Sequence, residues 1–199
     1  MDHMRVAIGL IAAGFTCVSC VAYIRAIASG ASSTRWSSWL IWTVSSAAGF
    51  ATYYGSGARE SVWVPLAYVV VCAAICAVAL WRRSEGGLSR VEVLCLVGAA
   101  LSLGVWWVSG SAVSGQVACV VVEVIAYIPI WLTARNENKP AWLLETAGSA
   151  LNMLAISPLS FALLLYPSAV LACNVLVVAL LPWTSRSRQQ QPEAEVVLA

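Results

Sequence analysis

The chain has 199 residues, of which 61% are hydrophobic and only 10% are charged, and its formal net charge is +2. Its mean hydropathy of +0.84 excludes an ordinary soluble globular domain. Apolar segments recur along the whole chain, so we expect one all-α integral membrane domain rather than a soluble domain with a single anchor.

Seven apolar segments are each close to the length that a bilayer crossing needs, roughly 20 residues. They predict transmembrane helices at about 5–28, 36–54, 62–81, 90–109, 112–133, 140–156 and 158–183. The fourth and fifth are separated only by Ser109-Gly110-Ser111, which predicts a tight turn. We therefore expect a transmembrane domain over 1–183 and a disordered cytoplasmic tail over 184–199.

Basic residues are distributed unequally between the two predicted sides of the membrane. One side carries only Arg5 and Arg59. The other side carries nine basic residues: Arg25, Arg35, Arg82, Arg83, Arg90, Arg135, Lys139, Arg186 and Arg188. Because lysine and arginine are enriched in cytoplasmic loops, this bias predicts a multi-pass protein of the cell membrane with its N-terminus outside and its C-terminus in the cytoplasm.

Glu123 is the strongest candidate for a functional residue in the chain. It lies near the middle of the fifth predicted span, about ten residues or ~15 Å from either end. Tyr127 follows by four and shares its helix face, and Pro129 permits a kink. Away from the ends of the predicted spans there is no lysine or arginine to neutralise Glu123, so we expect a protonated carboxyl that acts as a proton donor. The alternative is a protonated glutamate that only joins helices by hydrogen bonds.

Glu145 is the second acid in an apolar segment, and it lies closer to an end. It follows Pro140 by five residues, about ~8 Å into the sixth span. At that depth it is expected either to face the same cavity as Glu123 or to pair with Arg135 or Lys139 at the membrane surface. The sequence leaves both readings open.

Two asparagines could contribute to a polar cavity. Gly148, Ser149 and Asn152 follow Glu145 on one helical stripe, which suits either close helix packing or the lining of a cavity. Asn174 lies deep in the seventh predicted span.

Tryptophan is abundant, with ten residues in the chain. Several lie at predicted helix ends, where an interfacial aromatic belt explains them. Trp39 and Trp42 are three residues apart in the second span, and Trp106 approaches the outer end of the fourth. Aromatic faces beside an intramembrane acid would stabilise positive charge without acting as nucleophiles. Core packing is the alternative for each of them.

The chain contains a weak internal repeat. The first unit, YIRAIASGASSTRWSSWLIW, begins at Tyr23, and the second, YIPIWLTARNENKPAWLLET, begins at Tyr127, 104 residues later. Val64-Pro65 and Tyr166-Pro167 recur at a spacing of 102. The pattern predicts three helices, a linker helix and three further helices, a 3+1+3 parallel repeat in which both halves have the same orientation.

With these motifs, residues 5–183 resemble the SWEET and PQ-loop superfamily of seven-helix membrane proteins and a bacterial family of seven-helix proteins of this length. The resemblance implies small-metabolite transport, with an asparagine of the seventh helix and one of the third holding substrate. Asn174 matches the first of these, whereas the third helix has Cys72 at the corresponding height.

The chain also resembles integral-membrane terpene cyclases of the fungal meroterpenoid type, whose bacterial relatives act on prenylated indoles. This resemblance implies proton-initiated cyclisation of a prenylated substrate. The candidate acids are Glu123, Glu60 and Glu145, with Tyr127 beside them, and the stabilising wall would consist of Trp39, Trp42, Trp106 and Trp142.

Three functions thus follow as hypotheses. The first is a terpene cyclase. The second is a small-metabolite transporter in which Glu123 carries protons and Asn152 and Asn174 bind substrate. The third is a non-catalytic accessory protein. The single histidine, His3, lies near the N-terminus, so we expect no metal and no cofactor. The expected partners are the bilayer and a lipophilic small molecule, without nucleic acid, and the oligomeric state stays open.

Overall fold

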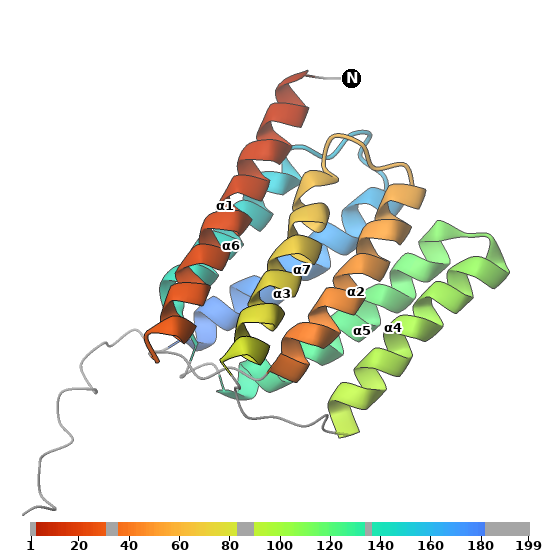
Figure 1. Cartoon of the computed structure of the whole chain (residues 1–199). Helices are drawn as coiled ribbons and strands as arrows, with labels where there is room; N and C mark the ends of the chain where they lie inside the picture. Colours follow the sequence, from red (N-terminus) through yellow and green to blue (C-terminus); the bar gives the residue numbers. More distant parts are fainter. Residues whose placement is uncertain (1–2, 31–35, 83–89, 134–136, 182–199) are drawn as a thin grey trace, which may run out of the picture.

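The computed structural model of the chain describes residues 3–30, 36–82, 90–133 and 137–181. These ranges contain helices and no strand (Figure 1). The helices are α1 (His3–Ala28), α2 (Trp36–Gly55), α3 (Trp63–Trp81), α4 (Arg90–Ser109), α5 (Ala112–Thr133), α6 (Lys139–Met153) and α7 (Phe161–Leu180). The expected all-α fold and its seven helices are thus confirmed for the described residues.

The helices differ in their capacity to cross a membrane. By length and composition, α1, α3 and α7 are long and apolar enough to span a bilayer. Shorter apolar stretches cover Val93–Ser109 in α4 and Ala112–Ile128 in α5. With 15 residues, α6 is about 22 Å long at the helical rise, less than the ~30 Å hydrocarbon core.

Two predicted boundaries are wrong. The sixth helix was expected to reach residue 156 but ends at Met153, because Leu154 and Ala155 form a turn whose N–H groups donate to Leu151 and Asn152 carbonyls. The seventh was expected from residue 158 but begins at Phe161, where the Ser160 side chain accepts a hydrogen bond from Leu163 N. The expected tail over 184–199 lies outside the described residues. The expected turn between α4 and α5 is confirmed, with Gly110 at a φ of 62° that glycine adopts without strain.

The helices form two layers (Figure 1). In one layer α3 lies between α1 and α2, and in the other α7 lies between α5 and α6. The layers meet where α1 packs against α6 and α2 packs against α5. α4 packs at one edge, against α2 and α5. The first three helices and the last three therefore have the same internal order.

Among the described residues, many large apolar side chains are exposed while a set of polar and charged side chains is buried. Large apolar side chains such as Leu10, Ile11 and Val70 are exposed. The buried polar and charged residues include Thr16, Ser19, Ser45, Ser46, Thr52, Gln116, Glu123, Glu145, Ser149, Asn152 and Asn174. An apolar exterior around a core of small and hydrogen-bonded polar residues is typical of helices that pack together within lipid.

A close approach of two backbones between the layers depends on a glycine. A Cβ atom at Gly148 of α6 would lie 2.9 Å from the Ala12 carbonyl oxygen and 3.0 Å from Phe15 Cβ, both on α1. Only a residue without a side chain lets the two backbones approach this closely. The contact brings the polar face of α1 against Glu145, one turn before Gly148.

Candidate functional site

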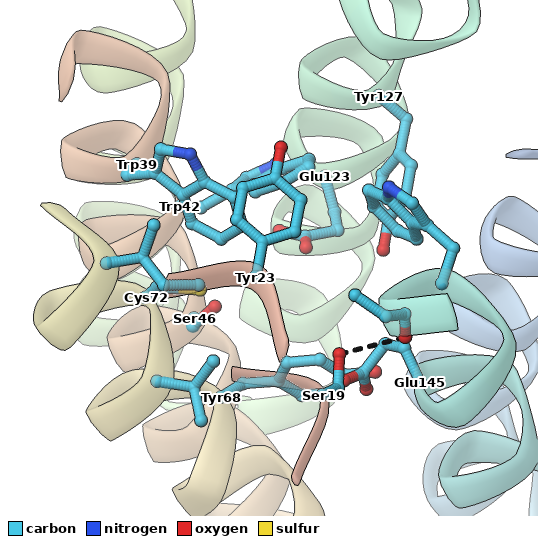
Figure 2. A pocket seen from close by; sticks show the side chains of 14 residues that line it. Ser19, Tyr23, Trp39, Trp42, Ser46, Tyr68, Cys72, Glu123, Tyr127 and Glu145 are labelled. Carbon is cyan, nitrogen blue, oxygen red and sulfur yellow. Dashed lines mark hydrogen bonds between the residues drawn. The ribbon is translucent and has the colours of Figure 1, made fainter. Parts of the chain in front are cut away.

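A pocket lies between the two layers, at the level where α1, α2 and α3 face α5 and α6 (Figure 2). Its cavity has a volume of about 40 Å³, roughly three times the 10–15 Å³ that one water occupies by this measure. The residues that line it are Ser19, Tyr23, Trp39, Trp42, Ser46, Tyr68, Val71, Cys72, Ile75, Glu123, Tyr127, Ala141, Trp142 and Glu145. Five helices thus contribute to one site that is rich in aromatic residues.

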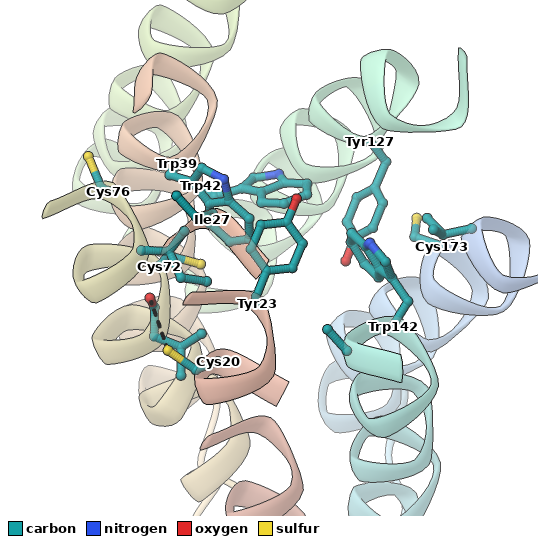
Figure 3. Close-up of a cluster of buried hydrophobic side chains, with 14 of the residues drawn as sticks. Cys20, Tyr23, Ile27, Trp39, Trp42, Cys72, Cys76, Tyr127, Trp142 and Cys173 are labelled. Carbon is teal, nitrogen blue, oxygen red and sulfur yellow. Dashed lines mark hydrogen bonds between the residues drawn. The ribbon is translucent and has the colours of Figure 1, made fainter. Parts of the chain in front are cut away.

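Five aromatic rings form a continuous wall of the pocket (Figure 3). Trp42 lies at its centre. The Trp42 ring is 5.1 Å from the ring of Trp39, 5.2 Å from Tyr127 and 6.1 Å from Trp142. Tyr23 extends the wall through Trp39, at 5.0 Å. Edge and tilted contacts at these distances are favourable for aromatic pairs and hold the rings in place.

Glu123 enters the pocket from α5 and is only 7% exposed. Its carboxyl oxygen Oε2 accepts a hydrogen bond from the Ser45 hydroxyl of α2, at 2.9 Å. Tyr127, one helical turn further, lines the same pocket. The helical spacing that predicted a shared face for Glu123 and Tyr127 therefore places both at the cavity. α5 continues as a helix through Pro129.

Glu145 enters the same pocket from α6 and is equally buried. Its Oε1 accepts a hydrogen bond from the Thr16 hydroxyl of α1, at 3.1 Å. The two acids therefore face one cavity from two helices of the same layer, α5 and α6 (Figure 2). Each accepts its hydrogen bond from a hydroxyl of the opposite layer. Arg135, which was considered as a partner for Glu145, lies outside the described residues.

Asn174 of α7 lies beneath the wall at the centre of a hydrogen-bond network. Its Oδ1 accepts from the Tyr127 hydroxyl at 2.7 Å, and its Nδ2 donates to Ser149 Oγ at 2.9 Å and to the Tyr68 oxygen at 3.3 Å. The Tyr68 hydroxyl and Ser149 Oγ are 3.0 Å apart and are also hydrogen-bonded to each other. The network joins α3, α5, α6 and α7, and it occupies both polar ends of the Asn174 amide.

Asn152 lies in a second and smaller cavity of about 10 Å³, which it shares with Tyr166. In the described part of the chain, neither Asn152 Oδ1 nor the Tyr166 hydroxyl has a hydrogen-bond partner. The volume is close to that of a single water, which could bridge the two groups. Asn152 therefore lies outside the main pocket.

Glu137, in the connection between α5 and α6, was not expected as a site residue. Its Oε2 accepts from the Tyr23 hydroxyl at 2.6 Å and from Trp142 Nε1 at 3.0 Å, and both donors line the pocket. Burial raises the pKa of Glu137, and the two hydrogen bonds lower it in part. Its place in a polar hinge (NENKP) suggests a solvated residue, so only the fold reveals this role.

The remaining predicted site residues lie elsewhere. Glu60 is in the connection between α2 and α3, where its backbone carbonyl lies against Gly9 of α1. Trp106 of α4 packs over two glycines: Cβ atoms at Gly115 and Gly55 would lie 2.6 Å and 3.1 Å from its side chain. Neither Glu60 nor Trp106 lines the pocket.

Tyr68 and Cys72 of α3 line the pocket although the sequence did not mark Tyr68. One signal was present: the two residues are four apart and share the face of α3 that includes Pro65 and Ile75. Among the described residues, no group of three histidine, cysteine or acidic side chains is placed to hold a metal ion. The pocket can instead hold a small ligand between aromatic faces and two carboxyls.

Comparison with protein-family models, with curated proteins and with solved structures gives no match.

Proposed function

We propose that this chain is a multi-pass membrane transporter that carries a small molecule through the central pocket. The observation that carries the proposal is the position of that pocket: both buried acids face a cavity between two three-helix layers with the same internal order. Ligand sites at the interface of two structural repeats are typical of transporters in which one repeat moves against the other.

The 3+1+3 repeat is part of this proposal, and the helix contacts support it. A shift from the first half to the second turns α1, α2 and α3 into α5, α6 and α7. Under that shift the contact of α1 with α6 becomes the contact of α5 with α2, and both are extensive. α4 then connects the halves, and each half lies in the membrane with the same orientation.

Pairs of pocket residues also correspond under the shift. Tyr23 corresponds to Tyr127, 104 positions later, and Trp39 corresponds to Trp142, 103 positions later. All four line the pocket. Each half thus contributes a tyrosine and a tryptophan to the cavity, as expected of a site between equivalent units.

The proposed orientation places the N-terminus outside. Among the described residues, Arg25, Arg82 and Lys139 lie at helix ends on the side where α1 ends and α6 begins, and Arg5 and Arg59 lie on the opposite side. The basic-rich side would be cytoplasmic. On that side Glu137 holds Tyr23 and Trp142 in place, so it would close the cytoplasmic end of the pocket.

The proposed coupling uses the two carboxyls. A buried acid that loses its proton must gain a positive partner or water, because an isolated charge is costly in a low-dielectric site. Glu123 and Glu145 would therefore exchange protons with the side to which the pocket opens, and substrate binding would be linked to that exchange.

A second candidate, a terpene cyclase, is favoured by the five aromatic rings beside the acids. Such rings would stabilise a carbocation, and Glu123 would supply the starting proton. The cavity of about 40 Å³ holds only a few heavy atoms, however, and a farnesyl chain would require the layers to separate. For this reason we place transport first.

The test uses purified full-length protein in liposomes with a trapped pH-sensitive dye, challenged with a panel of sugars, amino acids and amines. A transported substrate should move protons with the wild type and with Glu60→Gln, which is outside the pocket, but not with Glu123→Gln or Glu145→Gln. Conversion of a farnesylated indole into a cyclised product by the same protein, without any gradient, would overturn the proposal in favour of the cyclase.

A further inference from the structure

The ligand chemistry of the central pocket can be narrowed from the groups that face it. Two carboxyls, each 7% exposed, lie on its wall. The groups that donate to them are hydroxyls: Ser45 donates to Glu123, and Thr16 donates to Glu145, with the Tyr68 and Ser19 hydroxyls also in hydrogen-bonding position to Glu145. Among the described residues that line the pocket there is no lysine, arginine or histidine. When these carboxyls lose their protons, the protein supplies negative charge and leaves the positive charge to come from the ligand.

The aromatic wall favours the same sign of charge. Trp39, Trp42, Trp142, Tyr127 and Tyr23 surround a cavity on which the acids also open. Aromatic faces attract cations through their quadrupole, most strongly for tryptophan and when water is excluded, and several rings together form the cages that bind quaternary ammonium groups.

An unpaired donor adds a second requirement. Within the part of the chain that the structure describes, Trp42 Nε1 is buried without a hydrogen-bond partner, and the residue is 6% exposed. A buried N–H group without an acceptor costs free energy that a ligand can recover by accepting the bond. Because Trp42 lines the pocket, we take its missing acceptor to be an oxygen of the ligand, beside the cation.

The size of the cavity completes the description. About 40 Å³ corresponds to on the order of three waters. That space suits a compact ammonium or methylated ammonium group better than a sugar ring. From charge, aromatic lining, the unpaired N–H and volume, we infer that the central pocket binds a small organic cation that carries an ammonium group and a nearby hydroxyl or carbonyl oxygen.

This inference rests on the proposed transport function for its physiological meaning, but binding can be measured separately. The probes are choline, its uncharged carbon analogue 3,3-dimethyl-1-butanol, and tetramethylammonium, added to the full chain in detergent while tryptophan fluorescence is recorded. Choline should bind about thirtyfold more tightly than the uncharged alcohol, since a desolvated cation–π site is worth about 2 kcal/mol or more.

Two variants separate the contributions. Trp42→Phe keeps an aromatic ring but removes the N–H group, so it should weaken choline binding several-fold more than tetramethylammonium binding, which loses only part of one cation–π contact. Glu123→Gln combined with Glu145→Gln should abolish the preference for the cation, whereas Glu60→Gln should bind as the wild type does. Thermal unfolding of each variant confirms that it is folded.

Equal binding of choline and the uncharged alcohol would overturn the inference, as would equal loss of choline and tetramethylammonium binding in Trp42→Phe. Transport of an uncharged solute without any cation binding would refute the inference while the transport function stands. Tight choline binding without movement of choline across liposomes would support the inference and refute transport.

Discussion

Replacement of Asn174 by leucine tests whether the network beneath the pocket holds the helices together. The Asn174 side chain is fully buried. It accepts one hydrogen bond, from Tyr127, and donates two, to Ser149 and Tyr68. Asn174→Leu keeps the number and branching of the side-chain heavy atoms and removes all three bonds at once, at the point where α3, α5, α6 and α7 meet.

The expected loss can be worked out from these bonds. Hydrogen bonds between helices in a membrane contribute about 0.6 kcal/mol each, so three of them contribute roughly 2 kcal/mol. The Tyr127 hydroxyl also loses its acceptor, which adds about 1–2 kcal/mol, while Tyr68 and Ser149 still bond to each other. A total of about 3–4 kcal/mol corresponds to a fall in Tm of about 6–16 °C for a chain of this size.

Asn152→Leu is the matched control. Asn152 is also buried, at 2% exposure, but its Oδ1 has no partner among the described residues. Leucine there fills a small cavity and removes no paired oxygen, so its Tm should change by less than about 4 °C. The measurement is thermal unfolding of both variants in the same detergent. If Asn174→Leu were no less stable than Asn152→Leu but failed to bind substrate, Asn174 would be a ligand and not a packing residue.

Three further predictions concern packing, titration and access. Gly148→Ala should destabilise the protein by about 1–2 kcal/mol, because the new Cβ meets α1. Gly14→Ala is the control: its Cβ meets nothing within 4 Å, so the variant should be neutral or stabilising in thermal unfolding. Equal effects of the two substitutions would contradict the close approach of α1 and α6. Burial raises the pKa of Glu137 in the folded protein. The contribution of this proton to stability should therefore be complete below the ordinary pKa of 4.5 and be lost as the pH rises through the higher native pKa. A series of Tm values against pH should show this fall for the wild type and lose it in Glu137→Gln. In detergent, N-ethylmaleimide should modify the exposed Cys17 much faster than the buried Cys119. Peptide mapping by mass spectrometry measures both rates, and rapid modification of Cys119 would refute the packing of α5.

The sequence predicted those features of the fold that depend on local pattern. Apolar segments of about 20 residues predicted the helices, and glycine between two serines predicted the turn after α4. The spacing of four between Glu123 and Tyr127 predicted a shared face, and both residues do line the pocket. Each of these features is set by neighbours in the chain, so a single sequence is enough to find it.

The features that the sequence could not give depend on contacts between distant segments. Thr16 donates to Glu145 across 129 positions, and Tyr23 donates to Glu137 across 114. From its depth along the helix alone, Glu145 was expected either to form an ion pair at the membrane surface or to face the cavity. The close approach of α1 to α6 places it at the cavity. Trp106 was expected at the pocket wall but packs over glycines at the edge of the domain. Its position in an apolar segment does not distinguish between these two places.

The two acids also join the layers, and this dual role leads to a last prediction. Glu123 accepts from Ser45 where α5 meets α2, and Glu145 accepts from Thr16 where α6 meets α1. A cation in the pocket would compete with these hydroxyls for the same carboxyl oxygens, so ligand binding and contact between the layers would oppose each other. Ser45→Ala and Thr16→Val should each lower stability by about 0.5–1.5 kcal/mol and leave choline affinity equal or higher. Thermal unfolding and fluorescence titration of the same samples measure both effects, with Gly14→Ala as the control. A loss of choline affinity in both variants, at unchanged stability, would mean that the hydroxyls belong to the ligand site and do not tie the layers together.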